Sequence, residues 1–200
     1  FSDIRSFTTI SEGLTPRALI QHMNDFLTPM SDVVMQNRGT IDKYMGDAMM
    51  AFWNAPIDDA YHTVNACKAA LQMIEQLDVL NAQRREHNRD TPLLAAGIGI
   101  NTGLAAVGNM GSDQRFAYSA LGDSVNLASR LEAQTKAYRV DIILGQGSVA
   151  ENGVDALALL ELDLLRVKGR SAPTRIYPLL GDEKMAQSEG NNFGRNRIIF

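Results

Sequence analysis

The chain has 200 residues, of which 45% are hydrophobic and 21% are charged. These fractions are close to the averages of soluble globular domains, so they exclude wholesale disorder and a fibrous repeat. The net charge of −4 provides no broad positive surface for nucleic acid or an anionic membrane, and we expect no nucleic-acid partner. The single cysteine, Cys67, excludes an internal disulfide and a cysteine-rich zinc site.

The first residues read as the end of a strand that begins before Phe1, and they carry no initiator methionine or signal-peptide pattern. We therefore expect the chain to be a piece of a longer protein with an upstream regulatory or membrane domain. The longest apolar run, 93–100, is too short to span a bilayer. These features predict a cytoplasmic fragment, whether or not the parent protein is tethered to a membrane.

Helices are predicted where apolar residues recur every three to four positions. Thr15 is an N-cap residue followed by Pro16, and proline is favoured at the first helical position. Gly122 precedes another such segment. The predicted helices span 15–37, 59–85 and 123–136, with a short helical stretch over 147–152.

Strands are predicted at short apolar runs bounded by turn residues, namely 40–44, 48–53, 93–101, 104–109, 115–120, 140–144, 157–167 and 174–180. Hairpins are expected around Met45-Gly46, Thr102-Gly103 and Lys168-Gly169-Arg170. Because hairpins link several strands and helices lie between them, an α+β fold with one sheet fits better than a doubly wound parallel fold. The polar segment 181–200 predicts a disordered tail or linker.

Two carboxylates lie beside predicted turns. Asp3 stands at a strand end in FSDIRSFT, and Asp47 follows the Met45-Gly46 turn. Each one alone is explained by a capping residue or a surface hairpin. Together, two carboxylates on adjacent strand ends can share two divalent cations, and hard oxygen ligands suit Mg²⁺ or Mn²⁺. Phosphoryl transfer assisted by two metals uses this arrangement.

A third segment, 116–132, carries Gly122-Asp123 at a strand-to-helix junction. Asn126 and Arg130 are four residues apart, so they project from one face of the predicted helix. A solvated Asn/Arg pair is the ordinary explanation of this spacing.

Five segments, in chain order, resemble the class III nucleotidyl cyclase catalytic domain: FSDIRSFT, IDKYMGDAMMAF, GIGINTG, YSALGDSVNLASRLE and LLRVKGR. The resemblance covers 1–180 and leaves 181–200 as a polar tail. It implies a ferredoxin-like or palm-like sheet with helices packed on it. The glycines of 97–103 lack the spacing and the following helix of a dinucleotide fingerprint. The glycine-glycine-acidic hairpin of diguanylate cyclases is also absent.

The resemblance implies that Asp3, Asp47 and the main-chain carbonyl of Ile4 bind two Mg²⁺ or Mn²⁺ ions per site. It implies that the turn after Asp3 holds the β- and γ-phosphates through backbone amides, at Arg5, Ser6, Phe7 and Thr8, and that Ile4 also belongs to the substrate-binding residues. The family often has glycine where this chain has Ser6. If that position needs a positive φ, serine costs about 1 kcal/mol there.

The base-reading residues implied by the resemblance are Lys43 and Ser119. A lysine ammonium only donates hydrogen bonds, whereas a serine hydroxyl can accept one. Adenine offers an acceptor at N1 and a donor at N6, whereas guanine N1 carries a hydrogen that would face the ammonium. The guanylyl members of the family carry an acidic residue at the lysine position. We therefore predict ATP rather than GTP as the substrate.

In the family, residues matching Asn126, Arg130 and Lys168 orient the ribose, stabilise the transition state and reach the triphosphate. The implied reaction is attack of the ATP 3′-hydroxyl on the α-phosphorus, which yields 3′,5′-cyclic AMP and pyrophosphate. The predicted positions of His22, His62 and His87 suit none of them as a general base. The proton is expected to leave through solvent or a phosphate oxygen.

The resemblance also implies a head-to-tail homodimer with shared sites. Asp3, Asp47 and Lys43 are expected from one chain, and Asn126 and Arg130 from the other. Two alternatives to an adenylyl cyclase stay open. One is a guanylyl or dual-specificity cyclase, which Lys43 argues against. The other is a catalytically silent module that only dimerises or binds nucleotide, although no metal-binding Asp and no transition-state Arg is missing.

Overall fold

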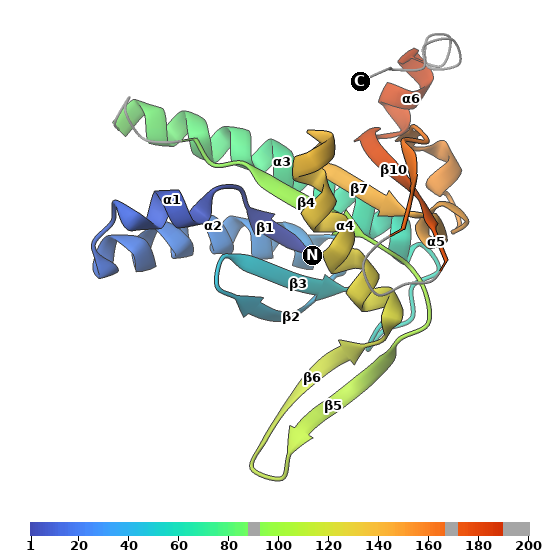
Figure 1. The fold of residues 1–200 in the computed structure, drawn as a ribbon, viewed down its shortest axis with the longest axis horizontal. Helices are drawn as coiled ribbons and strands as arrows, with labels where there is room; N and C mark the ends of the chain where they lie inside the picture. Colours follow the sequence, from blue (N-terminus) through green and yellow to red (C-terminus); the bar gives the residue numbers. More distant parts are fainter. Residues whose placement is uncertain (88–92, 167–171, 190–200) are drawn as a thin grey trace.

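The computed structural model describes residues 1–87, 93–166 and 172–189. Strands and helices are interspersed along the chain (Figure 1). The strands are β1 (Ser2–Ile4), β2 (Thr40–Met45), β3 (Ala48–Phe52), β4 (Ala96–Ile100), β5 (Ala106–Ser112), β6 (Arg115–Leu121), β7 (Ile142–Gly145), β8 (Ala158–Leu159), β9 (Asp163–Leu165) and β10 (Thr174–Gly181). The helices are α1 (Phe7–Glu12), α2 (Pro16–Gln36), α3 (His62–His87), α4 (Asp123–Tyr138), α5 (Gln146–Val149), the 3₁₀ helix η1 (Val154–Ala156) and α6 (Glu183–Glu189).

The main sheet has the order β2-β3-β1-β4-β7-β10-β8, and β9 also pairs with β10. Most of its pairings are antiparallel, but β4 and β7 are parallel. The short strand β1 lies between β3 and β4, with Ser2 opposite Met49 and Asp3 opposite Gly97. This mixed sheet with helices packed on it confirms the predicted α+β fold.

Helices cover both faces of the main sheet. On β7, Ile142 and Leu144 join the core that contains residues of α2 and α3, whereas Ile143 joins the core that contains residues of α4. Because side chains alternate between the faces of a strand, α2 and α3 lie on one face and α4 on the other. The predicted start of α2 is confirmed, since Thr15 Oγ1 accepts a hydrogen bond from the Ala18 N–H at 3.3 Å.

Glycine in β4 allows α4 to approach the sheet closely. A Cβ atom on Gly99 would lie 2.2 Å from the Ala128 carbonyl oxygen and 2.3 Å from the Glu132 nitrogen. No side chain fits in that space, so only glycine permits this contact between a helix backbone and a strand. The position of α4 over β4 and β1 is fixed in this way.

The predicted pairing of 93–101 with 104–109 is wrong. Strand β4 has β1 on one edge and β7 on the other, so neither edge can accept β5. The chain leaves the sheet after β4, and β5 pairs with β6 in a separate two-stranded sheet. Figure 1 shows this β5–β6 ribbon projecting from the body of the molecule.

The C-terminal segment also differs from the prediction. Residues 183–189 form α6 rather than part of a disordered tail, and α6 packs on β10 and β8. Asp182 Oδ1 accepts hydrogen bonds from the backbone N–H groups of Lys184 and Met185, which explains why a helix starts here. The remaining predicted tail, 190–200, lies outside the described residues. The predicted strand 157–167 is divided into β8 and β9, and β9 pairs with β10 as expected.

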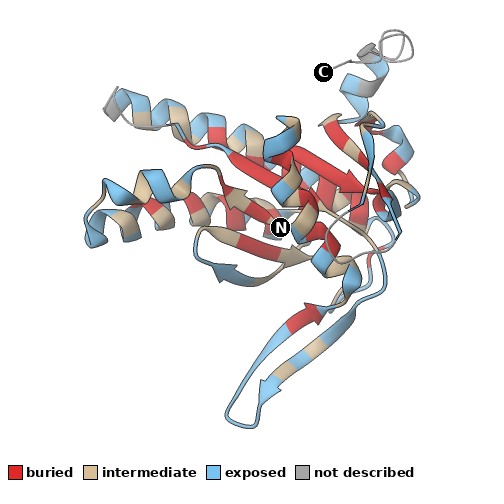
Figure 2. Cartoon of the chain, viewed as in Figure 1, coloured by how far each residue is buried: buried red, intermediate tan, exposed pale blue. Residues whose placement is uncertain are grey.

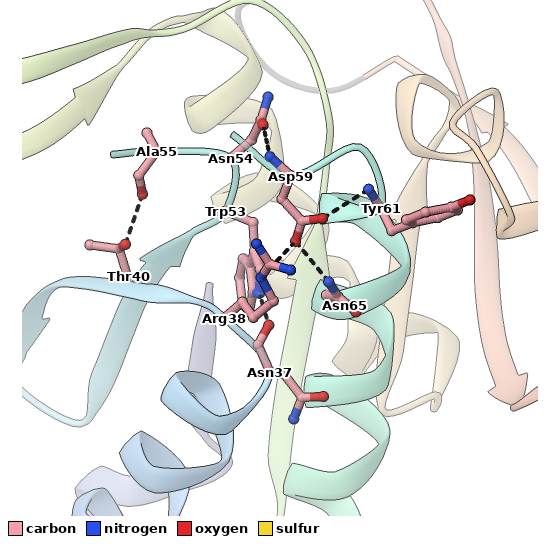
Figure 3. A network of polar contacts seen from close by, with 9 residues as sticks. All are labelled: Asn37, Arg38, Thr40, Trp53, Asn54, Ala55, Asp59, Tyr61 and Asn65. Atoms are coloured by element: carbon pink, nitrogen blue, oxygen red, sulfur yellow. Dashed lines mark hydrogen bonds and ion pairs between the residues drawn. The ribbon is translucent and has the colours of Figure 1, made fainter. Parts of the chain in front are cut away.

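A buried carboxylate fastens the loop that joins β3 to α3 (Figure 3). Asp59 accepts hydrogen bonds from the Tyr61 N–H at 3.0 Å and from Asn65 Nδ2 at 2.7 Å. Arg38 Nε, at the end of α2, lies 3.6 Å from Asp59 Oδ2. The Tyr61 N–H contributes most to lowering the pKa of Asp59, and Asn65 and Arg38 add to its effect against the cost of burial. The ionised carboxylate therefore ties the ends of α2 and α3 together.

We expect Asp59→Ala to lower the free energy of unfolding at pH 7 by about 2–3 kcal/mol, because two hydrogen bonds to a buried carboxylate are lost. The exposed neighbour Asp58 provides a control, since Asp58→Ala should change stability by less than about 0.5 kcal/mol. Because folding lowers the pKa of Asp59, its stabilisation is present above the ordinary value of 3.8 and disappears as the pH falls further. Urea unfolding at pH 7 and pH 3 measures both effects, and equal losses for the two variants would contradict this role.

Candidate active site

Two aspartates meet where β1 lies beside the β2–β3 hairpin. Asp3 is in β1, and Asp47 follows Gly46, which has a φ of 67° in the hairpin turn. The two carboxylates lie close enough to interact, and burial, followed by the effect of Asp47, raises the pKa of Asp3 to about 7. The Asp3 Oδ1 atom is buried and has no hydrogen-bond partner. The structure therefore brings together the two carboxylates that the sequence singled out.

This pair of carboxylates fits a divalent cation. Two adjacent negative charges repel each other, and a cation between them removes that repulsion. The unpartnered Asp3 Oδ1 is an oxygen ligand ready for use, and carboxylate oxygens are the ligands that Mg²⁺ and Mn²⁺ prefer. Ile4 follows directly on β1 with its side chain in the core, so its main chain is held beside Asp3.

Glu132 is a third carboxylate at this place, and the sequence analysis did not select it. It raises the pKa of Asp3, and its own pKa is raised mainly by burial. A Cβ atom on Gly97, the residue opposite Asp3 in β4, would lie 2.8 Å from Glu132 Oε1. The missing side chain at Gly97 makes room for this carboxylate. Glu132 is the last residue of the quoted segment LASRLE, but the residue spacing in that segment does not indicate that Glu132 lies beside β1.

The turn after β1 contains a strained residue. Ser6 adopts the left-handed conformation with φ 59° and ψ 28°, directly before α1. The sequence analysis expected serine to be unfavourable here if the position has a positive φ. The structure has that positive φ, so serine costs about 1 kcal/mol at this position. The Arg5 amide donates to the Ala95 carbonyl at 2.8 Å and is therefore not available to a phosphate. This leaves Ser6, Phe7 and Thr8 from the predicted set of backbone donors.

The predicted base-reading residues are in direct contact. Lys43 Nζ, on β2, donates a hydrogen bond of 3.3 Å to Ser119 Oγ on β6. Asp42, which the sequence analysis also did not select, contacts both residues. Its Oδ1 lies 3.1 Å from Lys43 Nζ, and its Oδ2 accepts a hydrogen bond from Ser119 Oγ. The contact joins the hairpin to the strand that leads into α4.

The remaining predicted residues lie on α4 or outside the described part of the chain. Asn126 is exposed and Arg130 is half-buried, on a different side of α4 from the buried Leu127, Ala128 and Leu131. The Arg130 Nη1 atom is buried without a hydrogen-bond partner. Lys168 lies outside the described residues.

A cavity of about 360 Å³ opens between β3, the first turns of α3 and α4 and the connection from β4 to β5. Its walls are mainly apolar and include Phe52, Val107 and Ala120, which is next to Ser119. This volume lies within the range of small-molecule sites. The start of α4 and Ala120 therefore line this cavity, whereas Lys43 and Ser119 are not among its lining residues.

The family model for the adenylate and guanylate cyclase catalytic domain matches residues 1–179 of this chain. The chain belongs to this family. Its relatives include Adenylate cyclase 1 of Rhizobium meliloti, at 38% identity over 181 residues, and the adenylate cyclase of Anabaena cylindrica, at 35% identity over 181 residues. These matches cover 90% and 88% of this chain but only 27% and 35% of the relatives. The chain thus spans about a third or less of their length.

Solved structures of cyclase domains share the fold. The crystal structure of the adenylyl cyclase CyaB from P. aeruginosa matches with a TM-score of 0.81 and 34% identity, covering 90% of this chain and 91% of that one. The guanylyl cyclase Cya2 matches with a TM-score of 0.78 and 30% identity, covering 90% and 89%. The similarity therefore extends to cyclases of both nucleotide classes. No helix among the described residues is both long and apolar enough to cross a membrane.

If the two aspartates of this cyclase domain hold cations, Asp3→Asn should abolish stabilisation by metal. Mn²⁺ at about 100 times its dissociation constant should stabilise the wild type by about 2.7 kcal/mol. Without metal, the variant should melt at a higher temperature than the wild type, and the difference should grow as the pH rises from about 4 to 7 and then level off, because burial and Asp47 disfavour ionised Asp3.

Thermal unfolding with and without Mn²⁺ measures these effects. Asp32→Asn, at an exposed position of α2, is the matched control and should respond to Mn²⁺ as the wild type does. An undiminished response of Asp3→Asn to Mn²⁺ would show that the ion binds elsewhere.

Proposed function

We propose that this domain is an adenylyl cyclase, which converts ATP to 3′,5′-cyclic AMP and pyrophosphate. The observation that carries the proposal is the meeting of Asp3 and Asp47, because a paired carboxylate site is what two-metal phosphoryl transfer needs. The relatives named adenylate cyclase at 34–38% identity support the same assignment. The proposal also includes a longer parent protein with a regulatory or membrane domain. It places the ATP-consuming domain in the cytoplasm.

In this proposal, Asp3, Asp47 and the carbonyl of Ile4 hold two Mg²⁺ or Mn²⁺ ions. When bound, the ions lower the pKa of the attacking hydroxyl and neutralise charge on the triphosphate. Asp3 Oδ1 supports this assignment, since it is a buried carboxylate oxygen with no other partner.

The chain's own residues bind and orient ATP. Lys43 donates to adenine N1 and Ser119 accepts from the N6 amino group, while the amides of Ser6, Phe7 and Thr8 bind the β- and γ-phosphates with Lys168. Asn126 orients the ribose. The guanidinium of Arg130 stabilises the charge that builds on the α-phosphate, and its buried Nη1 is free to do so.

Two histidines have partners within the chain. His22 is buried between α2 and α3, with Nδ1 2.9 Å from Arg84 Nη1. His62 Nε2 lies 3.5 Å from Glu151 Oε2. In this proposal the proton of the 3′-hydroxyl leaves through solvent or a phosphate oxygen. Catalysis rests on positioning, because the nucleophile and the electrophile belong to one molecule.

The domain acts as a homodimer in this proposal. Large apolar side chains on and beside the β5–β6 ribbon face solvent, including Leu104 at 98%, Phe116 at 67% and Leu121 at 60% exposure. Figure 2 shows that most of the ribbon is exposed. A two-stranded ribbon is marginally stable alone. A second copy of the chain that packs on this surface buries these apolar side chains, as in symmetric dimers generally.

Lys43 belongs with the α4 residues rather than with the metal pair in this proposal. Its contact with Ser119 joins it to β6, which runs directly into α4. Each shared site then takes Asp3 and Asp47 from one chain, and Lys43, Asn126 and Arg130 from the other. This grouping replaces the one expected from the sequence, in which Lys43 accompanied the two aspartates.

Product analysis tests the activity. With Mn²⁺ or Mg²⁺, the purified domain should form 3′,5′-cyclic AMP from ATP, with kcat/KM at least about tenfold higher than for GTP, because guanine leaves polar groups unpaired at Lys43 and Ser119. Chromatography of the products with each nucleotide and metal measures both rates. Comparable turnover of GTP would instead support a dual-specificity cyclase, and nucleotide binding without product would support a silent module.

Mixing inactive variants tests the shared sites. Asp47→Ala and Arg130→Ala should each be inactive alone but recover about a quarter of wild-type activity when mixed, because half of the dimers are mixed and each has one complete site. Lys43→Ala should recover activity with Asp47→Ala but not with Arg130→Ala, if Lys43 and Arg130 serve one site from one chain. Cyclic AMP formation after mixing is the measurement. Recovery in the pair Lys43→Ala and Arg130→Ala would contradict the grouping.

A further inference from the structure

Asp42 occupies an irregular position in β2. Ile41 pairs with Ala51 and Lys43 pairs with Met50, so Asp42 is the extra residue of a β-bulge. A bulge re-aims side chains relative to a regular strand. Here the Asp42 side chain is 0% exposed and contacts β6 together with the neighbouring Lys43.

The Asp42 carboxylate accepts two hydrogen bonds and forms one ion pair. Its Oδ2 accepts a hydrogen bond of 2.6 Å from Ser119 Oγ and another of 3.1 Å from the Ala120 N–H. Its Oδ1 forms an ion pair with Lys43 Nζ at 3.1 Å but accepts no hydrogen bond. A carboxylate can only accept hydrogen bonds, so the hydroxyl proton of Ser119 points at Asp42.

These contacts leave a defined set of hydrogen-bond donors and acceptors for a ligand. Ser119 Oγ has used its proton on Asp42 and one lone pair on Lys43, so it retains one acceptor. Lys43 Nζ has three N–H groups and donates one of them to Ser119, so it retains two donors beside its ion pair with Asp42. The side chain of Lys43 is 46% exposed, which leaves its ammonium open to a ligand.

We propose that Asp42 is a positioning residue that makes the Lys43–Ser119 pair selective for the adenine edge by holding the Ser119 proton. The proposal rests on the adenylyl cyclase function above. Without Asp42, the serine hydroxyl could rotate and either donate or accept, so it would not distinguish the N6 amino group of adenine from the O6 carbonyl of guanine or hypoxanthine. With Asp42, Ser119 can only accept, and a purine with O6 meets an acceptor facing an acceptor.

Inosine triphosphate is the discriminating probe, because hypoxanthine has the N1–H and O6 of guanine without its 2-amino group. The ratio of kcat/KM for ATP over inosine triphosphate should fall at least tenfold in Asp42→Ala. It should stay within threefold of the wild type in Asp42→Asn. The Ala120 N–H requires an acceptor, so the amide oxygen of the introduced asparagine takes the place of Oδ2 and still accepts the Ser119 proton. The Nδ2 group of the introduced asparagine faces Lys43 in place of Oδ1, so the ion pair is lost and the rate falls with both nucleotides.

Ser119→Ala separates this role from a general structural one. In that background Asp42→Ala should change the ratio less than twofold, because Asp42 acts through the serine proton. An unchanged ratio in Asp42→Ala, or an equal fall in Asp42→Asn and Asp42→Ala, would overturn the proposal. If a variant turns over neither nucleotide, displacement of a fluorescent ATP analogue by ATP and by inosine triphosphate gives the same ratio from binding.

The two levels of the proposal fail differently. A wild-type protein that forms no cyclic nucleotide from ATP overturns the adenylyl cyclase function, and the role of Asp42 with it. A wild-type protein that forms cyclic AMP, combined with an unchanged ratio in Asp42→Ala, overturns only the role of Asp42.

Discussion

The candidate site depends on the register of one three-residue strand. Strand β1 lies between β3 and β4, and the pairing of Ser2 with Met49 and of Asp3 with Gly97 places the Asp3 carboxylate against Asp47. A shift of one residue would turn Asp3 to the opposite face of the sheet, toward α2 and α3. The glycines of β4 contribute to the same arrangement, since they bring α4 and Glu132 close to this strand. The strand pairing and the helix docking therefore act together to concentrate negative charge at one point.

The site uses aspartate in two opposite ways. Asp3 and Asp47 lie close together, and no group of the described chain forms a hydrogen bond with Asp3 Oδ1. The repulsion between the two carboxylates therefore favours a bound cation. Asp42 forms an ion pair with Lys43 and accepts a hydrogen bond from Ser119, so its charge orients these two neighbours. The first arrangement raises the affinity for a cation, and the second fixes the direction of a proton. Only the surroundings of each carboxylate distinguish them.

Local features were predictable from the sequence, whereas features that depend on the order of strands were not. The cap at Thr15, the turn at Gly46 and the start of α4 after Gly122 follow from short-range chemistry and are present in the structure. The pairing of 93–101 with 104–109 failed because β4 has no free edge, and only the complete sheet shows this. Asp42 was passed over for a similar reason, since a bulge and a contact with β6 leave no mark in the spacing of IDKYMGD. The resemblance to a family supplied the role of each residue, which spacing alone left open.

Because the β5–β6 ribbon is exposed in a single copy of the chain, the proposed dimer makes activity depend on the protein concentration. Under the proposed arrangement, a dilute solution holds single copies, each with half of two sites and an apolar ribbon in water. A concentrated solution holds pairs with complete sites. The output per molecule then rises with the amount of protein present, so any cellular process that gathers copies together would switch on synthesis without altering a single bond within the chain.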